Sequence, residues 1–206
     1  MSILDIHTHH EAPQPEALVS VSPGNFVPLE GQLYSVGIHP WDTAVGKPID
    51  RNKLEEIASR NDVAAIGECG IDKLKGAPLF RQMQVFKTQI EISESLKKPL
   101  VIHDVKAHDI IFGLYRDIQP TQKWAIHGFR AKPGVAKMFT DTGIWLSFGE
   151  FFNPDSLKAV PKDFILAETD ESSLSIENII ERLSEVRGED LKDKILENTF
   201  RFLGRE

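Results

Sequence analysis

Eight short apolar runs, rich in β-branched residues, alternate with amphipathic segments along this 206-residue chain. Runs of this length and composition are typical of strands that are buried on both faces. Strands that alternate with helices indicate a parallel sheet with crossover connections. The expected strands are Ile3–Thr8, Ala17–Val21, Gln32–Gly37, Val63–Gly67, Leu100–His103, Lys123–His127, Gly143–Phe148 and Phe164–Glu168. We therefore predict an α/β fold, a (β/α)8 barrel of the TIM type, as a single domain over residues 1–206.

Helical spacing of apolar residues predicts a helix in most of the connections. The clearest is Leu79–Leu96, with Pro99 just beyond its end. The others are Asn52–Ser59, Ala107–Arg116, Gly134–Thr140, Ile176–Arg187 and Leu191–Leu203. The segment 11–48 is rich in proline and has no amphipathic helical pattern. Because a typical barrel of this type has about 250 residues, we expect a distorted barrel that is trimmed in its first βα units.

Charge and cysteine content narrow the classes of function. The formal net charge is −7, and an acidic chain without a run of Lys and Arg is not expected to bind duplex nucleic acid broadly through its phosphates. A site that acts on one phosphate stays compatible with this charge. The single cysteine, Cys69, excludes an intrachain disulfide and favours a reducing compartment. With no signal-peptide pattern and no membrane-spanning stretch, we expect a cytoplasmic protein with no membrane contact and no obligate protein partner.

Six side chains that can bind metal ions stand near the C-terminal ends of the apolar runs, where a (β/α)8 barrel carries its active site. They are His7, His9, Glu68, His103, His127 and Asp170. His7 and His9 lie two residues apart, so they project from one face of their strand. A lone His-x-His or a single strand-end histidine is more often structural. Histidines recur here at the ends of several strands, and this recurrence favours a shared metal site.

Glu68 stands where a core residue is expected. A buried carboxylate needs a cation as partner, so we expect Glu68 to bridge two metal ions. The alternative is an exposed acid at the end of a strand, but the flanking Gly67 and Gly70 favour close backbone approach instead. We expect one ion to be held by His7, His9 and Asp170, and the other by His103 and His127.

Asp170 is expected to act as both ligand and general base. The alternative is a helix N-cap, a common position for Asp, although the serines that follow can cap the next helix. Metal ions at this site would activate a water for attack at neutral pH. The mixed nitrogen and oxygen ligands suit Zn, Mn, Co or Ni better than a pure Mg site, with Mg left open.

Residues near these ligands are candidates for contact with substrate. We expect His39, at the end of the third run, and Arg130 to bind substrate, with a solvated surface side chain as the alternative for Arg130. Trp41 is equally compatible with a stacking platform and with a rim residue. Asp72 is placed to orient a histidine metal ligand by contacting a nitrogen of the histidine ring.

The motifs DIHTHH, VGIHPW, GECGID, VIHD, IHGF and AETD, in this order, resemble those of the TatD-like deoxyribonucleases, within the amidohydrolase-like superfamily of metal-dependent hydrolases. The closing segment LENTFRFLG is similar to the C-terminal helix of that family, so the resemblance covers nearly the whole chain. It implies one to three divalent ions on the same six ligands. Two segments at the substrate mouth depart from the family pattern. Asp104-Val105-Lys106 stands where an Arg is usual, and Glu171-Ser172-Ser173 where a small residue and Pro are usual.

The resemblance implies a hydrolase, specifically a nuclease of the deoxyribonuclease type that cleaves phosphodiester bonds with a metal-activated water. The expected cofactors are two divalent ions. The expected substrates are DNA ends, short single strands or a small phosphoester. One alternative is a metal-dependent hydrolase of another small ester, amide or lactone. A second is a non-enzymatic metal-binding protein on a decayed barrel, which the six intact ligands disfavour.

Overall fold

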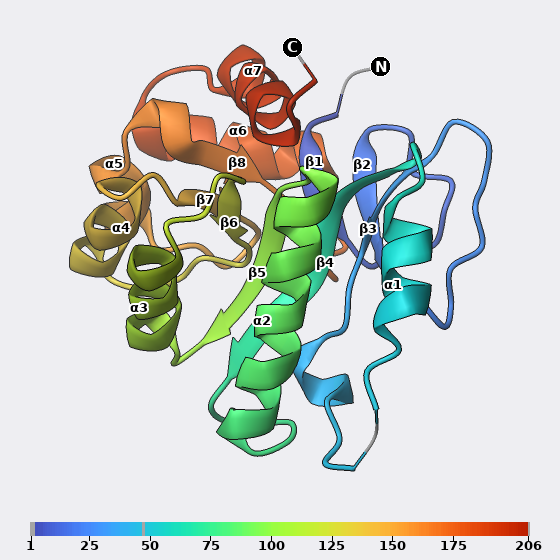
Figure 1. Cartoon of the computed structure of the whole chain (residues 1–206). Helices are drawn as coiled ribbons and strands as arrows, with labels where there is room; N and C mark the ends of the chain where they lie inside the picture. The colour runs from blue at the N-terminus through green and yellow to red at the C-terminus, as the bar shows by residue number, and fades with distance from the viewer. Residues whose placement is uncertain (1–2, 47, 206) are drawn as a thin grey trace.

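The computed structural model describes residues 3–46 and 48–205. Eight parallel strands, paired in chain order, form a closed barrel (Figure 1). The barrel closes where Asp5 of the first strand pairs with Ala167 of the last. The strands are β1 (Asp5–Thr8), β2 (Ala17–Val21), β3 (Leu33–Val36), β4 (Val63–Asp72), β5 (Leu100–Val105), β6 (Trp124–Ile126), β7 (Trp145–Phe148) and β8 (Ile165–Ala167). The predicted (β/α)8 barrel is therefore confirmed.

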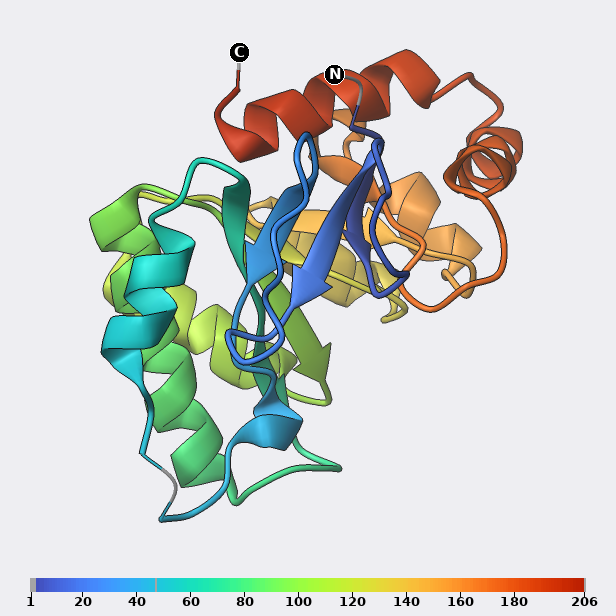
Figure 2. The same cartoon turned by 90° about the vertical axis from the view of Figure 1, so that its right-hand side faces the viewer.

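Helices surround the barrel and close one end of it. They are α1 (Arg51–Ala58), α2 (Leu79–Leu96), α3 (His108–Ile118), α4 (Pro133–Thr140), α5 (Pro154–Ala159), α6 (Ile176–Arg187) and α7 (Lys192–Leu203), with short 3-10 turns η1 (Pro40–Asp42) and η2 (Lys162–Phe164). The last helix, α7, lies across the N-terminal ends of the strands (Figure 2). Its Phe202 and Leu203 join a buried cluster with Ile3, Leu18 and Leu33. This packing leaves the opposite, C-terminal end of the barrel free for a site.

The first units of the barrel are reduced, as predicted. Residues 9–16 link β1 to β2 and residues 22–32 link β2 to β3, and neither segment contains a helix. In the part of the chain that the structure describes, no helix is both long and apolar enough to cross a membrane.

The structure differs from the sequence prediction at β4 and α5. We predicted that the fourth strand ends at Gly67, but β4 continues to Asp72 and pairs with β5 through Gly70↔His103 and Asp72↔Val105. A β-carbon on Gly70 would overlap the main chain of His103, so this pairing depends on the missing side chain. The short helix α5 was not predicted. It has only six residues, and the Asn153 side chain caps its first turn.

Candidate metal centre

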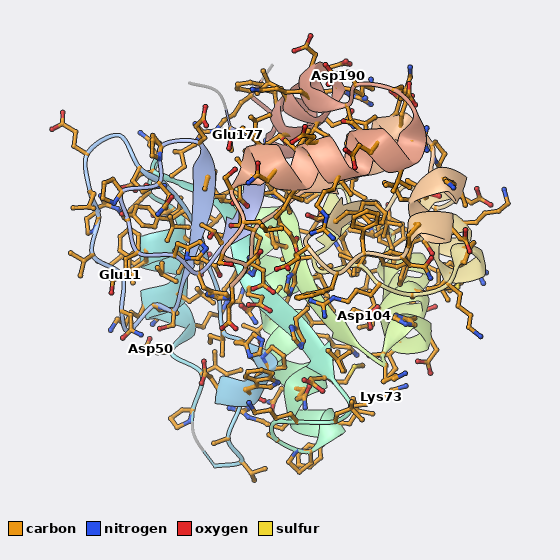
Figure 3. All side chains as sticks on the ribbon, turned by 180° about the vertical axis from the view of Figure 1, so that it is seen from behind. Glu11, Asp50, Lys73, Asp104, Glu177 and Asp190 are labelled. Atoms are coloured by element: carbon orange, nitrogen blue, oxygen red, sulfur yellow. The ribbon has the colours of Figure 1, made fainter. Side chains whose placement is uncertain are left out.

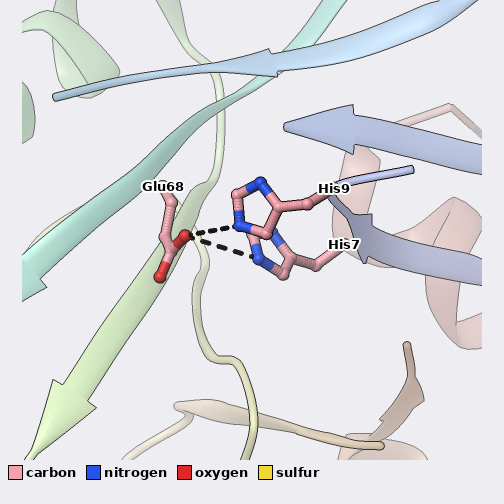
Figure 4. A group of neighbouring side chains, drawn as sticks. All are labelled: His7, His9 and Glu68. Atoms are coloured by element: carbon pink, nitrogen blue, oxygen red, sulfur yellow. Dashed lines mark hydrogen bonds and ion pairs between the residues drawn. The ribbon is translucent and has the colours of Figure 1, made fainter. Parts of the chain in front are cut away.

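Glu68 lies at the C-terminal end of the barrel with ring nitrogens of five histidines around its carboxylate. Its side chain is only 6% exposed. Oε2 is nearest to His9 Nε2 at 3.0 Å and His7 Nε2 at 3.5 Å (Figure 4). Oε1 is nearest to His127 Nε2 at 2.7 Å, His103 Nδ1 at 2.8 Å and His39 Nε2 at 3.1 Å. Burial would raise the pKa of Glu68, but His127, His103 and His39 outweigh it and hold the pKa well below its usual value. Glu68 is therefore an anion at the centre of a ring of nitrogen donors.

The burial and hydrogen bonding of His7 indicate whether this donor set fits a metal ion. Its side chain is completely buried, and neither ring nitrogen has a hydrogen-bond partner among the described residues. Burial, followed by the charge of His127, lowers the pKa of His7 well below its usual value, so the ring is neutral. Burial of a polar atom costs folding free energy unless the atom has a hydrogen-bond partner or binds a metal ion. A neutral imidazole nitrogen that faces a carboxylate without a hydrogen bond fits a metal ligand.

The backbone of β1 is tied to the segment that follows β8, and this brings Asp170 to the two histidines. The Asp170 N–H donates to the His7 carbonyl at 2.9 Å, and the His9 N–H donates to the Asp170 carbonyl at 3.0 Å. Asp170 Oδ1 then lies 3.8 Å from His7 Nε2 and 3.9 Å from His9 Nε2. Burial, followed by the charge of Glu168, raises the pKa of Asp170, which suits a group that must accept a proton.

Glu168 was not among the predicted site residues, and the structure places it beside His127. Its side chain is buried, and Oε1 accepts the Gly128 N–H at 2.5 Å and lies 3.5 Å from His127 Nδ1. Oε2 has no hydrogen-bond partner in the described part of the chain. Burial would lower the pKa of His127, but Glu68 and Glu168 outweigh it and raise the pKa well above its usual value. One signal in the sequence was available: Glu168 lies two residues before Asp170.

His103 is oriented by a carboxylate on the side away from Glu68. Its Nε2 lies 3.3 Å from Asp72 Oδ2, and the same oxygen accepts the Trp41 indole N–H at 2.7 Å. Burial would raise the pKa of Asp72, but hydrogen bonds from Trp41 and the neighbouring backbone lower it below its usual value. Asp72 is therefore an anion that can fix the tautomer of His103, the position expected from the sequence.

His39 is a hydrogen-bond donor toward the centre in its neutral form. Its Nδ1 accepts the Trp41 backbone N–H at 3.2 Å, so the proton of a neutral ring is on Nε2. That nitrogen is the one 3.1 Å from Glu68. This geometry favours contact with substrate over metal ligation, and the predicted substrate role of His39 stays a prediction.

The structure gathers all six predicted ligands, with Asp170 beside His7 and His9, and with His103 Nδ1 3.4 Å from His127 Nε2. The ligand atoms form three sets, and within each set all atoms lie within 4.8 Å of one another. They are His7, His9 and Glu68; His39, Glu68 and His103; and His127, Glu168 and Asp170. Glu68 belongs to two sets, and the second of them contains His39. The predicted bridging role of Glu68 stays a prediction. The predicted assignment of ligands to two ions stays a prediction.

Arg130 lies at the rim of the centre and not against Glu68. Its side chain is exposed, and its guanidinium carbon is 5.4 Å from the centroid of the Phe151 ring. Arg130 lines cavities that also contain Asp170. Its predicted contact with substrate is compatible with this position and stays a prediction.

The fold and the site together define a closed parallel barrel with a histidine–carboxylate centre at the C-terminal ends of its strands. The family model described as TatD related DNase matches residues 29–204. The chain belongs to this family, which confirms the resemblance seen in the motifs. The match begins after His7 and His9, so the position of these two residues in the site comes from the structure itself.

Curated relatives include YcfH of Escherichia coli K12 and a protein of Buchnera aphidicola, both described as uncharacterized metal-dependent hydrolases. YcfH is 29% identical over 152 residues, and the Buchnera protein is 31% identical over 155 residues. Each match covers 69% of this chain and 57% of the relative. The chain therefore matches little more than half the length of these proteins.

Solved structures share the fold. YjjV, a TatD homologue from Escherichia coli K12, superposes with a TM-score of 0.80 at 21% identity, covering 97% of each chain. A TatD family hydrolase from Entamoeba histolytica gives a TM-score of 0.77 at 12% identity, covering 100% of this chain and 99% of the other. At these identities the similarity shows the barrel alone.

Proposed function

We propose that this chain is a divalent-metal-dependent hydrolase that cleaves phosphodiester bonds of DNA, at ends or in short single strands. The observation that carries the proposal is the buried, neutral His7, whose ring nitrogens lack a hydrogen-bond partner among the described residues while Nε2 faces Glu68. The family match supports the nuclease chemistry. The mixed imidazole and carboxylate donors would hold two ions of Zn, Mn, Co or Ni, and Glu68, which faces His9 through one oxygen and His127 through the other, would be a ligand to both.

The residues of the chain divide the chemistry between them. When bound, divalent ions supply Lewis-acid charge for the phosphoryl oxygens and lower the pKa of a water molecule. Asp170, through its carboxylate, accepts the proton of the attacking water and returns it to the leaving oxygen. His39 donates its Nε2 proton to a phosphoryl oxygen, because its Nδ1 is engaged by the Trp41 backbone. Glu68 holds its neighbouring histidines in place around the reacting group.

Metal content tests the centre before any substrate is added. Protein reconstituted with Mn or Zn is analysed for bound metal, alongside His7→Ala and the matched control His10→Ala. His10 is exposed and is the last residue of the same motif, DIHTHH. We expect metal in the wild type and His10→Ala and a loss in His7→Ala, with circular dichroism to verify folding. Wild-type protein that stays metal-free in excess Mn and Zn contradicts the proposed centre.

Activity is measured on a single-stranded DNA oligomer, on bis(p-nitrophenyl) phosphate and on a panel of lactones and carboxylic esters. We expect EDTA-sensitive cleavage of the two phosphodiesters. Asp170→Asn should lower kcat by about 100-fold or more, the usual contribution of a general base. Turnover of lactones or esters without any phosphodiester cleavage would exclude the proposed substrate class. Near-wild-type turnover of Asp170→Asn would exclude the general-base role.

A further inference from the structure

Cavities that border the candidate metal centre differ in the charge of their walls. The cavity beyond β7 and β8 is lined by the carboxylates of Glu150, Glu168, Asp170 and Glu171, with Arg130 as its cation. The cavity beside β3 and η1 contains Asp42, Glu68 and Glu171 and, among its described lining residues, no Lys or Arg. A third cavity, at the ends of β5 and β6, has a volume of about 400 Å³. Its lining includes Lys106, His108 and Arg130, together with the carboxylates of Asp104 and Asp170. We call this third one the β5–β6 cavity.

The β5–β6 cavity opens directly onto the metal centre. His103, His127 and Asp170 form part of its lining. A group bound between Lys106 and Arg130 would therefore be a neighbour of the reacting group and not a distant surface ligand. The volume is within the range of small-molecule sites and suits one nucleotide unit.

The backbone of Lys106 has a left-handed conformation, which is unusual for a residue other than glycine and is found here in the lining of the β5–β6 cavity. In the described residues, four non-glycine residues have a positive φ. Two of them, Lys97 and Gln119, are helix C-caps, where this conformation is common. The other two, Lys106 at φ 57° and Asp170 at φ 53°, both line the β5–β6 cavity. A left-handed conformation is unfavourable for a residue with a β-carbon, and such residues concentrate at functional sites.

His108 is held in place by Asp104. The Asp104 side chain is buried, with Oδ1 accepting the Ala107 N–H at 3.0 Å and Oδ2 lying 2.5 Å from His108 Nδ1. The His108 side chain stays 30% exposed, so its other nitrogen is available to a ligand in the cavity. Figure 3 shows Asp104 beside α3, away from Asp190, which lies near α6 and α7.

We propose that the β5–β6 cavity binds a second, non-scissile phosphate of the substrate, with Lys106, His108 and Arg130 contacting the anion and Asp104 positioning His108. The proposal rests on the proposed phosphodiester chemistry and specifies its substrate class. A chain with a net charge of −7 needs local cations to hold a polyanion. In the other two cavities the carboxylates outnumber the Lys and Arg side chains, which disfavours phosphate. The preferred substrate is therefore a short strand with a phosphate flanking the bond to be cut.

The test compares three dithymidylates that differ only in a terminal phosphate: TpT, pTpT and TpTp. We expect the metal-loaded wild type to show a KM about tenfold lower for one of the phosphorylated forms than for TpT, the size of one charge-assisted hydrogen bond. In Lys106→Ala/Arg130→Ala the ratio of kcat/KM between that form and TpT should fall close to one. The control Lys137→Ala/Lys158→Ala removes two exposed lysines of α4 and α5 and should keep the wild-type ratio.

Binding is read separately by titrating thymidine 3′,5′-bisphosphate into the same proteins. We expect about tenfold weaker binding in Lys106→Ala/Arg130→Ala and none of this loss in the control pair. Asp104→Asn and His108→Gln should each raise KM for the phosphorylated substrate more than they change kcat, which a general loss of folding would not do.

The outcomes separate the two proposals. Cleavage of all three dithymidylates with equal kcat/KM, or an unchanged ratio in Lys106→Ala/Arg130→Ala, overturns the phosphate site and leaves the phosphodiesterase intact. Cleavage of none of them, by protein with full metal content, overturns the proposed function and the phosphate site with it.

Discussion

Asp72 and His103 form a carboxylate–histidine pair at the edge of the metal centre, with Asp72 Oδ2 3.3 Å from His103 Nε2. The opposite ring nitrogen, Nδ1, lies 2.8 Å from Glu68. A carboxylate on one nitrogen holds the proton there and leaves the lone pair of the other nitrogen for a metal ion. The Trp41 indole donates to the same Asp72 oxygen at 2.7 Å and so fixes the carboxylate in turn.

Asp72→Asn should weaken metal binding by about 10- to 100-fold, because the amide has no charge with which to hold the His103 proton. The affinity is measured by competition with a chelator of known strength. Asp109→Asn is the matched control, since Asp109 is an exposed carboxylate paired with Lys73 on the surface. Equal metal affinity in the two variants would show that Asp72 does not orient His103.

Glu168→Gln probes the second such pair, in which Glu168 faces His127. Gln keeps an acceptor for the Gly128 N–H but removes the charge that raises the pKa of both His127 and Asp170. Metal affinity should fall about 10- to 100-fold. Because the Asp170 pKa falls when the Glu168 charge is lost, the acid limb of the pH–rate profile should move to lower pH. Glu181→Gln, on the exposed face of α6, should change neither quantity.

The barrel was predictable because each strand is a short apolar run, and the helices between them keep helical spacing. The prediction failed locally where pairing with a neighbour decided the outcome. We predicted that the fourth strand ends at Gly67, yet β4 continues through Gly67 and Gly70 because their missing side chains allow β5 to approach. That continuation carries Asp72 to His103, whereas the sequence indicated only that Asp72 orients a metal ligand and not which one.

The site was predictable to the extent that its residues follow apolar runs. All six predicted ligands meet at one end of the barrel, because parallel strands end at the same face. Glu168 was missed since the sequence places it inside the last strand, where an acid reads as the end of that strand. The grouping of His127 with Glu168 and Asp170 depends on the contacts of Glu168 with Gly128 and His127, and spacing along the chain carries no information on them.

Asp163 links η2 to α7, and its effect on stability should depend on pH. Its Oδ1 lies 2.5 Å from Lys194 Nζ, and this hydrogen bond lowers the pKa of Asp163 below its usual value of 3.8. The stabilisation is therefore present above pH 3.8 and is lost as the pH falls through the lower folded-state pKa. Because Asp163 is more than half exposed, the coupling should reach at most about 1 kcal/mol. The coupling free energy is measured by a double-mutant cycle with Asp163→Asn and Lys194→Met, using urea unfolding at about pH 7 and about pH 3. An equal coupling free energy at the two pH values would contradict the ion pair between Asp163 and Lys194 as its source.

Gly70→Ala and Gly113→Ala place the same methyl group at two glycines with opposite surroundings. Gly70 has φ 137°, and its new β-carbon would overlap the His103 carbonyl oxygen, so β5 must move. We expect a loss of about 2–3 kcal/mol in the free energy of unfolding and weaker metal binding in the protein that folds, because the His103 backbone shifts. Gly113 lies inside α3 with nothing within 4 Å of its new β-carbon, and Ala there should stabilise the protein by about 1 kcal/mol. Urea unfolding and chelator competition on both variants measure these changes. Wild-type stability and metal affinity in Gly70→Ala would mean that the close approach of β4 to β5 does not position His103.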